Sequence, residues 1–201
     1  KFQRDHRRRA QEKRPVKIKL NIFLLVAVCI VLLDQITKWM IVRWVPLGTE
    51  VPVIAGVFDI VHGRNTGAAF GMLHAWDSSF KNLLFYAIGI VAVIFLFNYI
   101  KTVAEKDRLS IDALGLILGG ACGNVIDRIV RGSVVDFLSV HYHDVIWHFT
   151  FLGYRWTVPL IWPSFNVADA AISVAVVLLV IQNLKTAKKS GVRSQESGNK
   201  R

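Results

Sequence analysis

The stretch from residue 82 to residue 100 reads NLLFYAIGIVAVIFLFNYI, nineteen residues without a charged side chain between Lys81 and Lys101. An α-helix rises about 1.5 Å per residue, so a helix of this length nearly crosses a hydrocarbon core of about 30 Å. The whole 201-residue chain is apolar, with 53% hydrophobic residues and a mean hydropathy of +0.43. These values exclude an ordinary water-soluble domain and indicate an integral membrane protein.

Three further spans are predicted, but their uncharged cores are short. Residues 20–33, 113–126 and 170–184 each hold only fourteen or fifteen residues without a charge. About fourteen residues of helix reach only about 21 Å, so each of these spans must extend past an acidic residue. Ionisable groups at membrane depth are costly and usually functional. The predicted transmembrane helices are about 20–42, 82–100, 109–130 and 166–184.

Basic residues concentrate at the two ends of the chain. Residues 1–19 hold nine Lys or Arg against two acids, and residues 185–201 hold six against one. The body between them, residues 20–184, holds ten bases and eleven acids, whereas a nucleic-acid binder spreads basic residues over a folded face. We therefore expect no nucleic-acid partner. Because cytoplasmic segments of membrane proteins are enriched in Lys and Arg, both ends are interpreted as cytoplasmic tails of a four-span membrane domain at 20–184.

This topology gathers four acids toward the outer leaflet of the membrane. They are Asp34, Asp127, Asp136 and Asp169. The expected fold is an all-α membrane protein with four transmembrane helices, a small extracytoplasmic β-rich element and a long interfacial loop. Partial alternation with Pro and Gly predicts short strands within residues 51–64, and residues 138–165 form the loop.

Two local patterns refine this fold. Gly115, Gly119 and Gly123 recur at four-residue spacing in the third span, which favours close contact between helices. Pro163 and Ser164 precede the fourth span, and Ser164 is predicted as its N-cap.

Two of the acids are candidates for acid–base chemistry. Asp136 and Asp169 each lie at the outer end of a span among apolar neighbours. Two carboxylates close together in a low-dielectric site cannot both ionise easily, so they share a proton, and one acts as base while the other acts as acid. Such a pair activates water against an amide and protonates the departing nitrogen. At a single position, an acid facing water at the membrane boundary is the alternative.

Five short polar motifs surround these acids and favour a site. They are DQITK at 34–38, NTGAAFG at 65–71, GGACGNVIDR at 119–128, GSVVDF at 132–137 and FNVAD at 165–169. In this order they closely resemble the bacterial lipoprotein signal peptidases, the signal peptidase II family, and the resemblance covers nearly all of residues 20–184. It implies an aspartic endopeptidase that removes the signal peptide of a prolipoprotein, cutting just before a diacylglyceryl-modified cysteine.

The resemblance also implies a role for each matching residue. Asp136 and Asp169 match the catalytic dyad. The polar residues that line the family's site, and would bind substrate, correspond to Asn65, Asn124, Arg128 and Asn166. The positions that hold the site together correspond to Asp34, Lys38 and Asp127. For Asp127 and Arg128, a structural ion pair and direct contact with substrate both remain open, whereas Asp34 and Lys38, one helical turn apart, favour a structural pair.

The resemblance extends to partners and location. Diacylglyceryl-modified prolipoproteins and membrane lipids are the expected partners, no metal or organic cofactor is expected, and the chain is expected to act as a monomer. It would lie in the bacterial cytoplasmic (inner) membrane as a multi-pass protein with the site toward the outer leaflet. Activity should follow a bell-shaped pH profile that reports the dyad as a pair.

One segment departs from the family pattern. Twenty-nine residues separate Asp136 from Asn166, more than the family leads us to expect. His141, His143 and Asp144 in this segment are a weak indication of a metal site, because two His at i and i+2 without a HExxH pattern are not specific. An aromatic-rich segment at the membrane interface is the favoured interpretation.

Three rival functions would use some of the same residues. Ser133 with Lys38 would give a serine–lysine peptidase, but Ser133 lacks a nucleophile-elbow context. Cys122 is less favoured still as a nucleophile, because its motif contains no His. A small proton-coupled transporter would need acids at several depths, whereas here only Asp112 lies toward the inner face.

Overall fold

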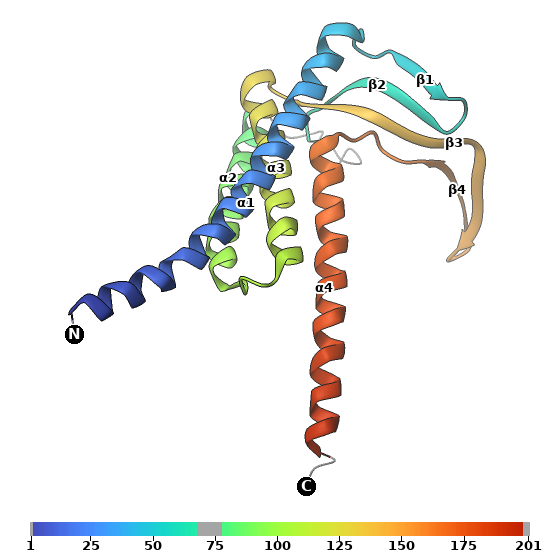
Figure 1. Ribbon diagram of the computed structural model, residues 1–201. Coiled ribbons are helices and arrows are strands. Elements are labelled where there is room, and N and C mark those ends of the chain that lie inside the picture. Colours follow the sequence, from blue (N-terminus) through green and yellow to red (C-terminus); the bar gives the residue numbers. More distant parts are fainter. Residues whose placement is uncertain (1, 68–77, 199–201) are drawn as a thin grey trace. The chain divides into compact units, whose positions relative to one another are not determined.

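The computed structural model describes residues 2–67 and 78–198 (Figure 1). Its elements in chain order are α1 (Phe2–Trp44), β1 (Glu50–Ile54), β2 (Phe58–Asn65), α2 (Ser78–Thr102), α3 (Arg108–Arg131), β3 (Val134–Phe151), β4 (Tyr154–Ile161) and α4 (Val167–Gly198). The predicted mainly-α fold with a small β element is confirmed. Residues 68–71 of the NTGAAFG motif lie outside the described residues.

Each helix contains a segment long and apolar enough to cross a membrane. These segments are Ile18–Trp44, Leu83–Thr102, Arg108–Arg131 and Val167–Lys188. The first and the third retain acidic and basic residues near their ends, as the short uncharged runs required. The chain is therefore a multi-pass membrane protein whose buried charges must be paired within the fold.

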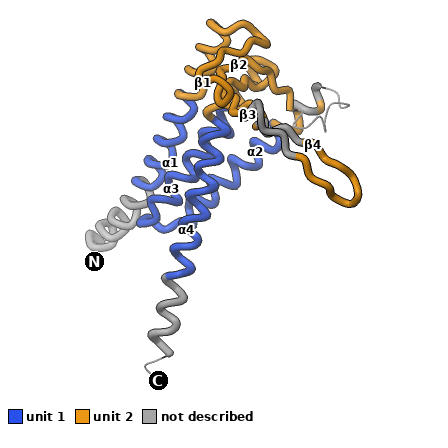
Figure 2. The backbone as a smooth tube through the Cα atoms, turned by 90° about the vertical axis from the view of Figure 1, so that its right-hand side faces the viewer, with its two compact units in different colours: residues 1–32, 86–123, 168–201 blue, residues 33–85, 124–167 orange. Residues whose placement is uncertain are grey.

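The fold consists of two compact units, drawn in different colours in Figure 2. Unit 1 comprises residues 1–32, 86–123 and 168–201, which are the larger parts of the four helices. Unit 2 comprises residues 33–85 and 124–167, which include the C-terminal ends of α1 and α3, the start of α2 and all four strands.

Unit 1 is held together by an apolar core between α1, α2 and α3. Its buried members are Phe23, Ala27, Leu96, Ile100, Ile111, Leu114 and Leu118. Phe23 also meets Phe97 edge to face, with ring centroids 5.5 Å apart. At the end of α2, the buried Lys19 donates hydrogen bonds to the carbonyl oxygens of Lys101 and Val103, which have no partner within a helix. This contact fixes the helix end with a charge of the favourable sign.

The glycines of α3 permit the close helix packing that their spacing predicted. A Cβ atom at Gly119 would lie 2.7 Å from the Ala27 carbonyl oxygen of α1, and one at Gly115 would lie 2.8 Å from that of Phe23. Gly120 faces α4 instead, where a Cβ would lie 2.5 Å from the carbonyl oxygen of Ala168. No side chain fits at these distances, so α3 approaches both helices through bare backbone.

Unit 2 contains an antiparallel sheet with the strand order β1-β2-β3-β4. The predicted strands within residues 51–64 are confirmed as β1 and β2, which pair from Glu50 opposite Val61. β3 first pairs with β2, then runs on beyond it and pairs with β4 (Figure 1). The segment expected as a long interfacial loop at 138–165 is therefore mostly a strand hairpin.

The prediction that Ser164 caps the fourth span is wrong, because α4 begins at Val167. Phe165 and Leu138 exchange two backbone hydrogen bonds of 2.8 and 2.9 Å, and this bridge holds Phe165 in an extended conformation. The helix can start only after the chain leaves that bridge, so Asn166 becomes the residue that precedes it.

Substitution of Gly119 by Val should destabilise the protein. The added side chain would overlap the Ala27 carbonyl oxygen and the Ile30 side chain, and overpacking of this kind costs about 1–3 kcal/mol. The measurement is thermal unfolding in detergent, with Ala87→Val at an exposed position of α2 as the control. Equal midpoints for both variants would contradict the close packing of α3 on α1.

Candidate active site

The turn between α3 and β3 positions the first site residues. Gly132 adopts a φ of +73° and its N–H donates to the Arg128 carbonyl oxygen, a glycine cap that ends the helix. The chain then enters β3, where the Val135 N–H donates to Asp127 Oδ2 at 2.9 Å. Asp127 thus holds the backbone immediately before Asp136, which fixes the start of that strand.

Lys38 of α1 lies at the centre of a buried charge cluster. Its Nζ is 2.9 Å from Asp34 Oδ2, 3.0 Å from Asp127 Oδ2 and 2.9 Å from Asn124 Oδ1. The side chains of Lys38, Asp34 and Asp127 are all fully buried. An ammonium group has three N–H donors, so each donor of Lys38 has an acceptor.

Two residues that the sequence reasoning did not assign complete this cluster. Arg131 pairs with Asp127 Oδ1 and donates to Gln35 Oε1 at 3.0 Å. Gln35 Nε2 in turn lies 3.1 Å from Asp34 Oδ2. The spacing of four residues between Asp127 and Arg131 on a helix was the signal available for this pair.

The composition of the cluster explains how charges persist inside a membrane protein. Lys38 and Arg131 carry two positive charges, and Asp34 and Asp127 carry two negative charges, so the cluster is neutral. Isolated ions are very costly in a low-dielectric interior, whereas paired and hydrogen-bonded ions are tolerated. Loss of any one member would leave a buried charge without its counter-ion.

Two asparagines connect this cluster to Asp136. Asn124 Oδ1 accepts from Lys38 and also from Asn166 Nδ2 at 3.3 Å. Asn166 Nδ2 lies 2.8 Å from Asp136 Oδ1 and 3.3 Å from the Val135 carbonyl oxygen. Asn166 is fully buried and Asp136 is only 4% exposed. The Asp136 carboxyl group is therefore tied to α1 through two carboxamides.

The second oxygen of Asp136 is held by Asn65 at the end of β2. Asn65 Nδ2 donates to Asp136 Oδ2 at 3.0 Å, while Asn65 Oδ1 accepts from the Gly67 N–H at 2.8 Å. Gly67 has a φ of +90°, and a Cβ at this position would lie 2.1 Å from the Phe85 ring. Only glycine meets both constraints, which explains the Asn-Thr-Gly order of the motif.

Arg128 occupies a different environment from Asp127. Its guanidinium lies 4.2 Å from the centroid of the Phe85 ring, and Nη1 donates to the Asn124 carbonyl oxygen at 3.1 Å. A guanidinium over an aromatic face is a cation–π contact, which suits a charge beside apolar surroundings. The side chains that tie Asp127 into the cluster are those of Lys38, Arg131 and Gln35.

Asp169 lies in the first turn of α4, within unit 1. It is partly buried, and its carbonyl oxygen accepts a hydrogen bond from Ser173 Oγ at 2.9 Å. The other eight residues assigned from the motifs lie together in unit 2. Along the chain, Asp169 follows Asn166 by three residues.

A cavity of about 320 Å³ opens in unit 2 beside the strand that carries Asp136. Its lining includes Gly63 and Ser164, and Gly63 pairs with Asp136 in the sheet. A Cβ at Gly63 would lie 3.3 Å from the Asp136 carbonyl oxygen. Gly63 thus belongs both to the cavity lining and to the strand position opposite Asp136.

The chain matches the family described as signal peptidase (SPase) II over residues 26–185. The matched region begins within α1 and ends within α4. It therefore includes every residue that was assigned to the site from the sequence motifs.

The solved structures that are similar to this chain include the following two. Both are structures of a bacterial membrane enzyme determined by the in meso method, at 2.3 Å and 1.9 Å resolution. Each is 32% identical to the chain, with TM-scores of 0.66 and 0.64. The similarity covers 83% and 81% of this chain, and 90% and 92% of the other chains.

Replacement of Lys38 by Met should destabilise the fold severely. Met has a similar length but no charge, so Asp34 and Asp127 would lose the cation that they share, at a cost of about 3–5 kcal/mol. Thermal unfolding in detergent measures the effect.

The matched control is Arg108→Ala, which breaks another i, i+4 pair, with Asp112, at side chains 61% and 33% exposed. Exposed pairs contribute about 0–1 kcal/mol, so this variant should unfold close to wild type. A Lys38→Met protein as stable as Arg108→Ala would contradict the buried cluster.

Proposed function

The chain belongs to the signal peptidase II family and is a membrane peptidase of lipoprotein processing, and from this premise we propose an aspartic mechanism for it. Asp136 and Asp169 together activate a water molecule. The substrate is a prolipoprotein, cut just before its diacylglyceryl-modified cysteine. The matched family region and the burial of Asp136 are the basis of the proposal.

The environment of Asp136 is the main structural support for its proposed role as an acid or base. Asp136 is only 4% exposed and each of its carboxyl oxygens accepts from a different carboxamide, so the group is held in one orientation. Asn65 and Asn166 are neutral, so these hydrogen bonds orient the carboxyl group without adding a counter-charge. A catalytic acid or base must be held in a fixed position relative to the reacting atoms.

Chain connectivity supports Asp169 as the second member. Three residues span at most about 10 Å between Cα atoms, so Asp169 remains tethered close to Asn166, which bonds Asp136. Gly120 and Asn124 lie one helical turn apart on α3; the first packs on Ala168 and the second bonds Asn166. Both contacts act on the residues that lead into the first turn of α4.

The proposed reaction needs one proton to be taken and one to be given. One carboxylate removes a proton from water while the water oxygen attacks the scissile carbonyl carbon. The other carboxyl group donates its proton to the amide nitrogen as the carbon–nitrogen bond breaks. The products are the carboxylate of the signal peptide and the free amine of the modified cysteine.

The rival serine–lysine mechanism loses support from the buried cluster. All three N–H donors of Lys38 are engaged by Asp34, Asp127 and Asn124, so Lys38 has no position left to accept a proton from Ser133. A lysine that activates a serine must instead face it with a free lone pair.

The charge distribution supports a site toward the outer leaflet. The Lys- and Arg-rich tails favour the cytoplasmic side for both termini. The C-terminal ends of α1 and α3 then emerge on the opposite side, and these ends carry Lys38, Asn124 and Asp127. A substrate anchored by two acyl chains would supply much of its own binding free energy through the bilayer.

Asp136→Asn and Asp169→Asn should each abolish most cleavage of a diacylated prolipoprotein. Asparagine keeps the size of the side chain and removes the exchangeable proton, and acid–base catalysis contributes about 100- to 10,000-fold in rate. The measurement is the initial rate with purified protein in lipid, and the same peptide without its acyl chains should not be cleaved.

Ser133→Ala is the control and should retain most activity, because Ser133 has no role in the proposed reaction. Full activity in either Asp variant would refute the dyad. Complete loss in Ser133→Ala, with the protein folded, would favour the serine mechanism instead.

The orientation is tested with a membrane-impermeant thiol reagent on intact cells stripped of any outer envelope. A single cysteine at Thr150→Cys, an exposed position of β3, should react, and a cysteine appended after Arg201 should react only after the membrane is opened. The reverse pattern would contradict an outward-facing site.

A further inference from the structure

The outer part of the β3–β4 hairpin is a two-stranded ribbon with two chemically different faces. We define this distal ribbon as residues 148–157. Opposite residues of an antiparallel pair share a face, and faces alternate along each strand. The pairs are His148 with Thr157, Phe149 with Trp156, Thr150 with Arg155, and Phe151 with Tyr154.

One face of the distal ribbon is aromatic. Phe149 and Trp156 stack across the strands, with ring centroids 6.4 Å apart and planes inclined by 10°. They are 46% and 50% exposed, and Phe151 and Tyr154 are 61% and 74% exposed. Four aromatic side chains therefore form one surface that the described part of the chain leaves largely uncovered.

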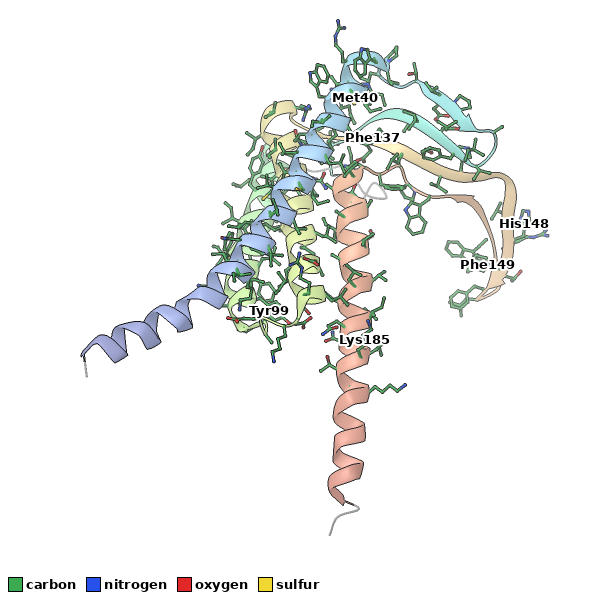
Figure 3. All side chains as sticks on the ribbon, viewed as in Figure 1. Met40, Tyr99, Phe137, His148, Phe149 and Lys185 are labelled. Carbon is green, nitrogen blue, oxygen red and sulfur yellow. The ribbon has the colours of Figure 1, made fainter. Side chains whose placement is uncertain are left out.

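The opposite face is polar. It carries His148, Thr150, Arg155 and Thr157, and His148 Nδ1 lies 3.2 Å from Thr157 Oγ1 across the strands. Figure 3 shows His148 and Phe149 on opposite sides of the ribbon. An alternation this complete is typical of a strand pair between an apolar and an aqueous phase.

The turn at the tip of the ribbon carries an apolar residue, Leu152, whereas hairpin turns usually carry polar residues or glycine. Leu152 has a φ of +52° and Gly153 a φ of +80°, so both residues adopt the left-handed conformation of a tight hairpin turn. Asn or Asp is preferred at the first of these positions, and a leucine there is strained. Leu152 is 81% exposed, so nothing within the described chain explains the choice of this side chain.

The other segments of unit 2 indicate what contacts the aromatic face. The unit contains the C-terminal ends of two membrane-crossing helices and the start of a third. On α1, Trp39 and Trp44 are 55% and 63% exposed and meet edge to face at 5.7 Å. Exposed Trp at a span end marks the level of the lipid head groups, so unit 2 already borders a bilayer surface.

We propose that the aromatic face of the distal ribbon and Leu152 insert into the interface of the bilayer next to the end of α1. Phe149, Phe151 and Leu152 supply apolar surface, while Tyr154 and Trp156 carry a polar atom suited to the head-group level. His148 and Arg155 on the other face remain in water. The ribbon holds β3, the strand that carries Asp136, against the membrane surface where a lipid-anchored peptide is presented.

This proposal rests on the membrane location of the chain and is independent of the catalytic dyad. Its test therefore measures contact with lipid and not cleavage. Cys29 and Cys122 are the two cysteines of the sequence, so Cys29→Ser with Cys122→Ala gives a background for single-site labels.

A fluorophore sensitive to polarity is attached at Leu152→Cys or, as the matched control, at Thr150→Cys on the polar face. Each protein is placed as a single copy in a nanodisc, with lipids that are unmodified or brominated on the acyl chains. The label at 152 should emit at shorter wavelength and lose most of its emission to the bromines. The label at 150 should do neither, and Asp136→Asn should leave both results unchanged.

Equal quenching at the two positions, or none at position 152, would overturn the proposal. A label at 152 that becomes shielded only when a prolipoprotein is added would assign the face to substrate instead. Shielding that appears only when two copies share a disc would assign it to a second copy of the chain.

Discussion

Lys38 is the group on which the site depends, because its ammonium is shared by Asp34 and Asp127 in a region without exposure to solvent. Burying charges inside a membrane protein is costly unless they are neutralised, and here Lys38 and Arg131 together balance Asp34 and Asp127. Their geometry therefore fixes α1 and α3 in one register. From the same residue, Asn124 and Asn166 extend the network to Asp136, so the contacts that neutralise the buried charges also orient the Asp136 carboxyl group.

The two parts of α3 make different kinds of contact. Its first part is packed through glycines, where backbone meets backbone on α1 and at Ala168. Its last two turns present polar groups, Asn124, Asp127 and Arg131, to α1 and to β3. Small residues allow close backbone contact in the first part, and direct hydrogen bonds and ion pairs join the polar side chains in the last two turns.

Much of the architecture could be predicted from the sequence, and particular residues show why. The uncharged run at 82–100 is too long and too apolar for a helix exposed to water, so it predicts a transmembrane helix. The basic ends indicate that both termini are cytoplasmic. The glycine spacing predicted close packing, and the sheet confirms the strands within 51–64. The roles of Arg131 and Gln35 were missed, since a polar residue near a span end has many possible partners. The prediction of Ser164 as a cap failed because Phe165 is held by β3.

The sequence alone determined the membrane class and the number of spans, and it indicated the family and the candidate site residues, because hydrophobic length, charge placement and ordered polar motifs are local properties. Only the tertiary structure decided how those residues bond. The Asn65 side chain bonds both Asp136 and the Gly67 N–H, and Gly67 needs a positive φ for this turn. Asp127 accepts from the Val135 N–H because the glycine cap at Gly132 ends α3 and directs the chain into β3. The amphipathic ribbon likewise exists only through the register of β3 on β4, since pairing between strands distant in sequence decides which side chains share a face.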